Sequence, residues 1–509
     1  MKPALRLPLI AAVLAATLAL SGCVSWFAPN AQLTSTPTGE SVSVELEPYY
    51  SQVLEWAVCE DEFQCATVQA PLDWSDPGRD SIDLAIIRAV ASGTRLGSLL
   101  INPGGPGGSG FEFVRDSLDY AVSARLKASY DVVGFDPRGV NKSSAVDCYD
   151  EPSEMTDFLY ELSPNDFGTE AWIDDLEKSS AQFGAACLEH TGELLGYVDT
   201  VSAARDLDLL RAVLGDEKLN YLGYSYGTLL GATFAELYPK KTGRLVLDGA
   251  VDPATTDFEV TATQAQGFES ALRAYLADCM TGTECPFRGS VDESMTEIRA
   301  MFEGLDVSPL RASDGRLLGS GAMFNALILP LYSQSGWPYL TELFVEVFSG
   351  EADLAFQLAD SYYGRNTDGT FLDNSTEAFI AINCLDYKPT STRQTLHDEA
   401  AELARLAPVL GRQMSYGGTS CADWPFPSTR ERVPIAASGS APIVVVGTTN
   451  DPATPYEWAQ ALAGQLENGY LVTYEGEGHT AYNKSNSCVN DAVDNYFIDG
   501  TVPETDPLC

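Results

Sequence analysis

The sequence predicts an α/β fold, a mainly parallel β-sheet with helices on both faces, into which a helical cap is inserted. Three observations support this prediction. Short apolar and β-branched runs alternate with helical segments through the first half of the chain. A long stretch with helical periodicity and no clear strand alternation follows. The strand signal then returns near the C-terminus, where continuous apolar runs are typical of parallel strands buried on both faces.

The first half of the chain alternates between predicted strands and helices. Each predicted strand is a short run of apolar residues, many of them β-branched. Two helices are predicted in this half: the helix at residues 203–214 is amphipathic, and the helix at residues 228–238 stops at Pro239, which cannot continue a helix. The predicted strands are residues 82–90, 98–102, 130–135, 219–222 and 244–249, and the helices are residues 203–214 and 228–238.

The second half divides into a helical part and a returning strand part. Helical periodicity dominates in residues 264–277 and 395–406, and strands are expected again at 442–447 and 470–474. We therefore expect one sheet interrupted by an insertion, although two independent domains would also fit the pattern. The predicted division is a first core segment at residues 46–258, a mainly helical cap at 259–435 and a second core segment at 436–509.

The N-terminus has the features of an export signal. Lys2 and Arg6 precede an uncharged apolar run that is too short to span a membrane, so residues 1–22 are predicted to be a signal peptide. The small residues before Cys23 resemble a bacterial lipobox, which predicts that Cys23 is lipidated; an ordinary signal peptide cut elsewhere is the alternative. Residues 23–45 then form a flexible tether, and the lipid is the expected means of membrane attachment.

Charge and cysteine content narrow the class of protein. Acidic residues outnumber basic ones by 72 to 30, a net charge of −42, which argues against nucleic acid as a partner. Ten cysteines remain after Cys23, an even number that indicates disulfides in an exported chain. With three histidines and no CxxC pair, no metal site is predicted. Pairing of sequence neighbours predicts the disulfides Cys59–Cys65, Cys148–Cys187, Cys279–Cys285, Cys384–Cys421 and Cys488–Cys509.

A candidate nucleophile lies in the motif Gly-Tyr-Ser-Tyr-Gly at residues 223–227. G-x-S-x-G is a weak signal by itself, but here it follows a predicted strand and opens a predicted helix. That strand–turn–helix setting is the one a nucleophile elbow requires, because a strained turn exposes the serine hydroxyl. The sequence therefore predicts Ser225 as the nucleophile of a serine hydrolase.

A serine nucleophile needs a base and an orienting carboxylate. Of the three histidines, His479 follows the last predicted strand, whereas His190 and His397 lie in polar helical stretches. Asp451 follows the preceding strand and completes the chain order Ser, Asp, His. Asp248, at the end of an earlier strand, is the rival acid.

Two backbone amides are expected to hold the oxyanion. One belongs to Tyr226, directly after the nucleophile, and the other to the Gly-rich run at residues 103–108, where we choose Gly105 with Gly104 second. A phosphate loop is disfavoured because this run has no lysine in the Walker position. No metal or organic cofactor is expected.

These motifs together resemble those of a known family. Residues 102–110, 136–139 and 223–228, with the loops of Asp451 and His479, are similar to the secreted actinobacterial tripeptidyl aminopeptidases. These are relatives of prolyl aminopeptidases among the serine peptidases of the α/β-hydrolase fold. Pro103 departs from the prolyl branch, where a histidine usually precedes the two glycines.

The resemblance implies an exported serine exopeptidase that releases short peptides, with tripeptides as the expected products, from free N-termini. A cap carboxylate would then meet the cationic substrate amine. Asp386 is a candidate by its position in the shared motif, but an ordinary solvated or structural carboxylate is the favoured interpretation of Asp386, and no single acidic residue is assigned to the amine. An esterase or lipase using the same Ser225 is the second hypothesis. A non-catalytic solute-binding lipoprotein is the third.

Overall fold

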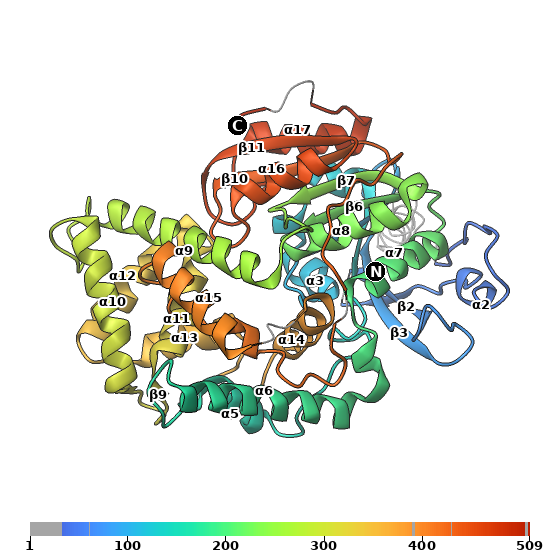
Figure 1. Ribbon diagram of the computed structural model, residues 1–509. Helices are drawn as coiled ribbons and strands as arrows, with labels where there is room; N and C mark the ends of the chain where they lie inside the picture. Colours follow the sequence, from blue (N-terminus) through green and yellow to red (C-terminus); the bar gives the residue numbers. More distant parts are fainter. Residues whose placement is uncertain (1–32, 61, 389–391, 429, 504–506) are drawn as a thin grey trace, which may run out of the picture.

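The computed structural model describes residues 33–60, 62–388, 392–428, 430–503 and 507–509. A nine-stranded sheet forms its centre (Figure 1). The strands are β1 (Ala57–Cys59), β2 (Phe63–Pro71), β3 (Ser81–Ala89), β4 (Gly97–Asn102), β5 (Tyr130–Phe135), β6 (Leu219–Tyr224), β7 (Thr242–Asp248), β10 (Ile443–Asn450) and β11 (Gly469–Glu477).

The strand order is β1-β2-β3-β5-β4-β6-β7-β10-β11. All pairs from β5 to β11 are parallel, and β1, β2 and β3 pair antiparallel at one edge. The predicted mainly parallel α/β sheet is thus confirmed. β1 and β2 were missed, because β2 has only partial alternation of buried and exposed residues and ends at Pro71.

Helices cover both faces of the sheet, and side chains alternate between them along each strand. On β7, Leu245 and Leu247 face the cluster that includes α7, α8 and α16, whereas Val246 faces the cluster that includes α3, α4 and α17. The helices of these two layers are α3 (Gly110–Ala121), α4 (Ala124–Ser129), α7 (Thr200–Leu214), α8 (Tyr226–Leu237), α16 (Tyr456–Gln465) and α17 (Ser487–Asp499).

Between β7 and β10 the chain forms a helical region with an apolar core of its own. Figure 1 shows this region beside the sheet rather than over its faces. A two-stranded hairpin, β8 (Leu310–Arg311) with β9 (Leu317–Leu318), interrupts the helices. The helices are α9 (Asp257–Cys279), α10 (Val291–Val307), α11 (Ser320–Leu331), α12 (Trp337–Phe348), α13 (Asp353–Tyr362), α14 (Ser375–Asp386) and α15 (Arg393–Leu406).

Two helices from before the elbow also pack against this region. They are α5 (Pro152–Tyr160) and α6 (Glu170–Thr191), which lie along its lower side in Figure 1. Tyr160 belongs to the apolar core of the helical region, and Ile173 of α6 packs with Leu396 of α15. The structural cap therefore includes helices that the predicted boundary at residue 258 assigned to the core.

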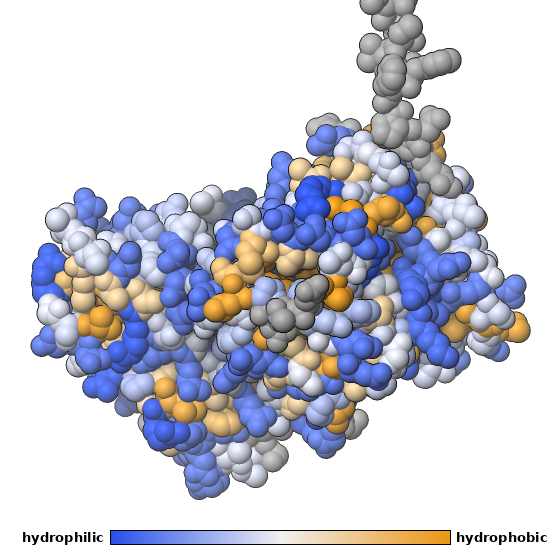
Figure 2. All heavy atoms as spheres, turned by 90° about the horizontal axis from the view of Figure 1, so that it is seen from above, coloured by the Kyte–Doolittle hydropathy of each residue, from blue (hydrophilic) through white to orange (hydrophobic). Residues whose placement is uncertain are grey.

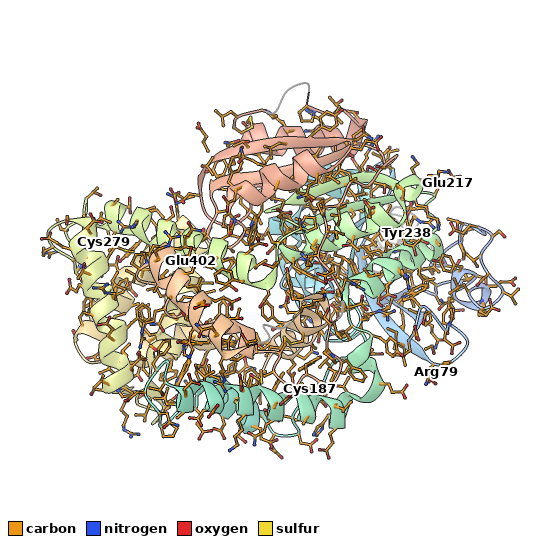
Figure 3. All side chains as sticks on the ribbon, viewed as in Figure 1. Arg79, Cys187, Glu217, Tyr238, Cys279 and Glu402 are labelled. Carbon is orange, nitrogen blue, oxygen red and sulfur yellow. A yellow bond between two sulfur atoms is a disulfide. The ribbon has the colours of Figure 1, made fainter. Side chains whose placement is uncertain are left out.

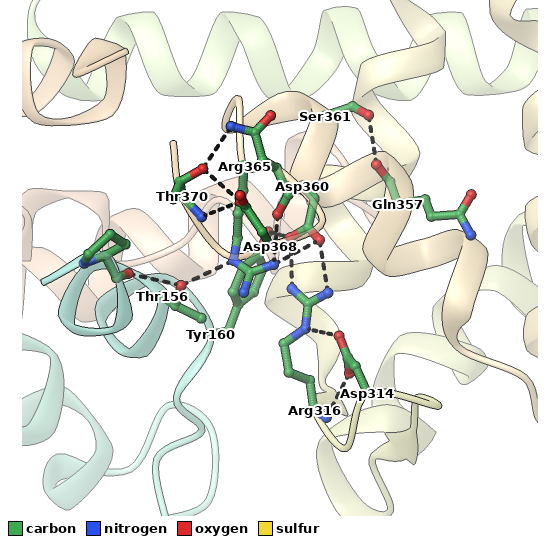
Figure 4. Close-up of polar contacts among 12 residues, drawn as sticks. Thr156, Tyr160, Asp314, Arg316, Gln357, Asp360, Ser361, Arg365, Asp368 and Thr370 are labelled. Atoms are coloured by element: carbon green, nitrogen blue, oxygen red, sulfur yellow. Dashed lines mark hydrogen bonds and ion pairs between the residues drawn. The ribbon is translucent and has the colours of Figure 1, made fainter. Parts of the chain in front are cut away.

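A polar cluster joins α5 and α13 to the hairpin (Figure 4). Arg316, in β8–β9, binds both oxygens of Asp360 at 2.7 and 2.8 Å, and Tyr160 donates its hydroxyl to the same carboxylate at 2.8 Å. Arg365 lies 3.4 Å from Asp360 and donates to Thr156. Because Asp360 is buried and multiply bonded, the cluster holds three separate segments of the cap in register.

All five predicted disulfides are present. They are distributed over core and cap: Figure 3 labels Cys187 on α6 and Cys279 at the end of α9. Within the described residues, no helix is both long enough and apolar enough to span a bilayer. The surface seen in Figure 2 is largely hydrophilic with separate apolar patches, as expected for a chain rich in acidic residues.

The described part of the predicted tether lies against the core. Ser35 pairs with Leu54, and the amide of Thr38 donates to the carbonyl of Ala212 at 2.9 Å. Glu40 bridges Arg211 and Lys241 at 2.7 Å each. The prediction of a flexible tether therefore does not hold for residues 35–40, because Glu40 meets two cations. The predicted signal peptide and Cys23 lie outside the described residues.

Candidate active site

The elbow at Ser225 is a sharp turn between β6 and α8. Ser225 has φ 55° and ψ −125°, a conformation that non-glycine residues rarely adopt. The flanking glycines permit close packing: a Cβ on Gly223 would lie 2.4 Å from the Gly227 carbonyl oxygen, and a Cβ on Gly227 would lie 2.7 Å from Asn102 Oδ1. The predicted strand–turn–helix setting of Ser225 is thus present.

The Gly-rich loop after β4 lies directly against this turn. A Cβ on Gly104 would lie 2.7 Å from the Ser225 Cβ and 3.3 Å from the Tyr226 nitrogen, so only glycine fits. The Gly104 amide donates to Asn102 Oδ1 at 3.0 Å and is therefore engaged. Gly105 and Tyr226 line the same cavity as Ser225, and the Tyr226 amide begins α8, where no intrahelical acceptor exists.

His479 follows β11 and is bonded to the carboxylate of Asp451. Its Nδ1 lies 2.9 Å from Oδ1 and 3.0 Å from Oδ2 of Asp451. Asp451 is buried and accepts backbone N–H groups from Ala453, Thr454 and Thr480 at 2.9 to 3.1 Å. An acid held by three amides presents a fixed orientation to the imidazole.

Thr454 and Tyr332 add contacts around this pair. The Thr454 hydroxyl donates to Asp451 Oδ2 at 3.0 Å and lies 3.2 Å from His479 Nδ1, so its side chain does not cap α16. Tyr332, in the cap, packs edge-on against the imidazole at 5.4 Å between ring centroids. The carbonyl of Tyr332 also accepts the His479 backbone N–H at 2.8 Å. No sequence signal pointed to Tyr332.

Asp248, the rival acid, contacts the chain beyond His479 rather than its ring. Its carboxylate accepts the amides of Ala481 and Tyr482 at 2.8 to 3.0 Å, and burial raises its pKa. Its carbonyl accepts the Ser225 amide at 2.9 Å. A Cβ on the next residue, Gly249, would lie 3.3 Å from His479 Cε1. The end of β7 thereby holds the elbow and the histidine loop at one edge of the sheet.

A cavity of about 230 Å³ opens beside the elbow. Its walls come from both core and cap, namely the Gly-rich loop, the start of α9, α14, the loop near residues 417–421 and the start of α16. Ser225 and Thr454 line it on the core side, and Asp257 and Phe379 line it on the cap side. A substrate at Ser225 would therefore contact the cap.

Asp386, the candidate for the substrate amine, is not available to a ligand. It is 2% exposed and accepts the amide and hydroxyl of Thr200, with Arg430 Nη1 at 3.7 Å. Burial and the charge of Asp199 raise its pKa to about 6. Asp386 is thus a structural carboxylate that joins α14 to the start of α7.

The remaining histidines are remote from the elbow in their contacts. His397 binds Glu170 at 2.7 Å, and His190 lies 3.5 Å from Asp150. In the described part of the chain, no three His, Cys, Asp or Glu side chains are grouped to hold a metal ion.

Comparison with known proteins finds two matching family models and relatives that cover nearly the whole chain. Residues 97–291 match the model of the alpha/beta hydrolase fold, and residues 407–509 match that of TAP-like proteins. The chain is 36% identical to serine protease Hip1 of Mycobacterium tuberculosis over 531 residues, covering 99% of this chain and 98% of the relative. It is 35% identical to carboxylesterase B of the same species, with the same coverage.

A third relative is the tripeptidyl aminopeptidase of Streptomyces lividans. It is 29% identical over 472 residues, which cover 90% of this chain and 86% of the relative. These relatives span nearly the full length of the chain, and the two matched models describe both segments of its core. The chain therefore belongs to the tripeptidyl aminopeptidase family of α/β-hydrolase serine hydrolases.

Proposed function

We propose that this protein is an exported serine exopeptidase that releases short peptides, most simply tripeptides, from free N-termini. The observation that carries the proposal is the bonded pair of His479 and Asp451, which Thr454 links to the cavity: Thr454 donates to Asp451 and lines the same cavity as Ser225. The Hip1 and tripeptidyl aminopeptidase relatives support peptides as substrates.

In the proposed mechanism, Ser225 attacks the scissile carbonyl while His479 accepts its proton. Asp451 holds the imidazole and stabilises the imidazolium that forms. The amides of Tyr226 and Gly105 donate to the oxyanion, and the engagement of the Gly104 amide by Asn102 favours Gly105 over Gly104. His479 then protonates the leaving amine, and water releases the acyl-enzyme. These steps need no metal or cofactor.

The first test is labelling by a fluorophosphonate probe, together with turnover of a tripeptide anilide. Ser225→Ala should abolish labelling, and His479→Ala should lower kcat by roughly four orders of magnitude or more, as triad removals do in other hydrolases. Circular dichroism of each variant confirms folding. Near-normal turnover in folded His479→Ala would show that another group is the base.

An esterase using the same residues is the second candidate, and the carboxylesterase B relative is the observation that favours it. Tripeptide anilides and p-nitrophenyl esters separate the two functions. Fast ester cleavage without any anilide cleavage would replace the peptidase proposal with this one.

Export and lipid attachment are proposed from the N-terminal signal together with the disulfides. Five disulfides suit an oxidising compartment outside the cytoplasm. Cys23 would carry the lipid. Metabolic labelling with a fatty-acid analogue in a bacterial host should mark the wild type and not Cys23→Ser; equal labelling of both would assign the lipid elsewhere.

A further inference from the structure

Asp257 is a carboxylate in the cavity that the mechanism does not use. It is the first residue of α9 and lines the cavity together with Ser225 and Tyr226. Its carboxylate has no hydrogen bond or ion pair to any other described residue, whereas Asp248 and Asp386 are both bonded. Burial raises the pKa of Asp257. A half-buried carboxylate without a partner lacks compensation for its lost hydration.

The start of α9 does not need Asp257 as a cap. Thr256 is the N-cap and accepts the Glu259 amide, while the Glu259 carboxylate accepts the Thr256 amide at 2.8 Å. This capping box satisfies the amides of Thr256 and Glu259 without a contribution from the Asp257 carboxylate. The position of Asp257 in the cavity is therefore not explained by helix capping.

The described lining contains one acidic side chain, Asp257, and one cation, Lys388, which is paired with Glu431. Arg432 stacks over the lining residue Tyr387, but the pKa of Asp257 is raised by burial and is not lowered by either cation. Gln264 donates its amide nitrogen to the Ala453 carbonyl, and so its oxygen remains as a further acceptor in the described structure. A cavity with an uncompensated carboxylate and an amide acceptor suits a cationic N–H donor.

We propose that Asp257 binds the α-ammonium group of the peptide substrate and so restricts cleavage to free N-termini. This inference rests on the proposed exopeptidase function. With the scissile carbonyl at Ser225, on the core wall, the N-terminal part of the substrate extends across the cavity to the start of α9. A blocked N-terminus lacks the positive charge and the ammonium N–H donors that would bind the Asp257 carboxylate.

The test compares three substrates: a tripeptide p-nitroanilide, its N-acetylated form and p-nitrophenyl acetate. In Asp257→Asn, kcat/KM for the free tripeptide should fall about 10- to 100-fold, mainly through KM, the range expected for a lost charged hydrogen bond. The acetylated peptide and the ester should change less than twofold. Asp257→Glu should recover part of the loss.

Glu259→Gln is the matched control, since it removes one negative charge from the same helical turn while Gln can still complete the capping box. It should leave all three substrates unchanged. If Asp257→Asn does not fold, Asp257→Ser replaces it, with the rate of fluorophosphonate labelling as the check on the elbow.

Two results would overturn the inference about Asp257. In the first, the wild type prefers the free tripeptide over the acetylated one, and Asp257→Asn shows the same preference. The exopeptidase proposal would then stand, but without a role for Asp257. The other is an equal loss on all three substrates, which would make Asp257 structural. Equal cleavage of free and acetylated tripeptides by the wild type would instead refute the exopeptidase proposal itself.

Discussion

At the scale of single residues, the pKa values of two neighbouring carboxylates behind the elbow, those of Asp199 and Asp386, are shifted in opposite directions. Burial raises the pKa of Asp199, but Arg430 and Ser202 outweigh this effect and the net pKa is lowered. Burial and the charge of Asp199 raise the pKa of Asp386 to about 6. The Thr200 hydroxyl bonded to Asp386 also lies 2.5 Å from the Tyr226 hydroxyl. The protonation of Asp386 is therefore linked to a residue of the elbow.

The pH dependence of stability tests this arrangement. The native state keeps a proton on Asp386 between its ordinary pKa of 3.8 and about 6, whereas the unfolded chain has lost it. The contribution of Asp386 to stability is thus lost as the pH rises through this window, by at most about 1.4 kcal/mol per pH unit. Asp386→Asn lacks this loss, so its stability relative to the wild type should rise from pH 4 to pH 6.

Thermal unfolding of both proteins from pH 4 to pH 7 measures that difference. Parallel Tm curves would mean that Asp386 remains ionised throughout the window. Asp157→Asn is a suitable control, because Asp157 lies on helix α5 and has no contact with Asp199 or Asp386 in the described structure. The Tm curve of this variant should follow that of the wild type.

At the scale of elements, the fully buried strands and the elbow were predictable because their information is local. β4 and β5 are buried at every residue, and each has a run of apolar residues at its centre. The order of Ser225, Asp451 and His479 predicted that Asp451 would lie beside His479, as it does. Their catalytic roles remain proposals.

The contacts from the cap could not be predicted in this way. Tyr332 contacts His479, and Asp257 lines the cavity of Ser225, only because cap helices dock on the sheet edge, and no local pattern encodes that docking. The same holds for α5, whose Tyr160 joins the cap through packing with residues distant in sequence. Asp386 is buried and bonded to Thr200, as the favoured structural interpretation expected; the shared motif alone could not show whether this carboxylate is free or buried.

The elbow itself offers a test at this scale. In Gly223→Ala the added Cβ would lie 2.4 Å from the Gly227 carbonyl, which forces β6 and α8 apart. We expect a loss of about 1–3 kcal/mol in the free energy of unfolding. Fluorophosphonate labelling should also slow at least about tenfold, since a small displacement of a reacting group is costly. Calorimetry and labelling kinetics measure the two effects.

Gly464→Ala, in the last turn of α16, is the matched control. A Cβ there meets open space, and the substitution should stabilise the protein by about 0.5–1 kcal/mol through helix propensity, with labelling unchanged. Labelling of Gly223→Ala at the wild-type rate would show that the elbow tolerates the separation.

At the scale of the whole molecule, the cavity depends on how firmly the cap is held to the core. The cap has its own apolar core and the Arg316–Asp360 cluster, so it is stiff within itself. The disulfide Cys384–Cys421 acts where the cavity is formed. Cys384 lies on α14, which also carries the lining residue Phe379, and Cys421 lines the cavity from the following loop.

Removal of this disulfide should therefore affect stability and substrate binding together. Its cysteines are 37 residues apart, which corresponds to about 4 kcal/mol of loop-closure entropy, against about 2 kcal/mol for Cys59–Cys65, which are 6 residues apart. The double variant Cys384→Ala/Cys421→Ala should lower Tm and raise KM for a tripeptide anilide, because two walls of the cavity lose their link. Cys59→Ala/Cys65→Ala, at the sheet edge formed by β1 and β2, should lower Tm less and leave KM unchanged. An equal rise in KM in both variants would mean that the disulfides act through global stability, and that the link between α14 and the cavity loop has no separate part in binding.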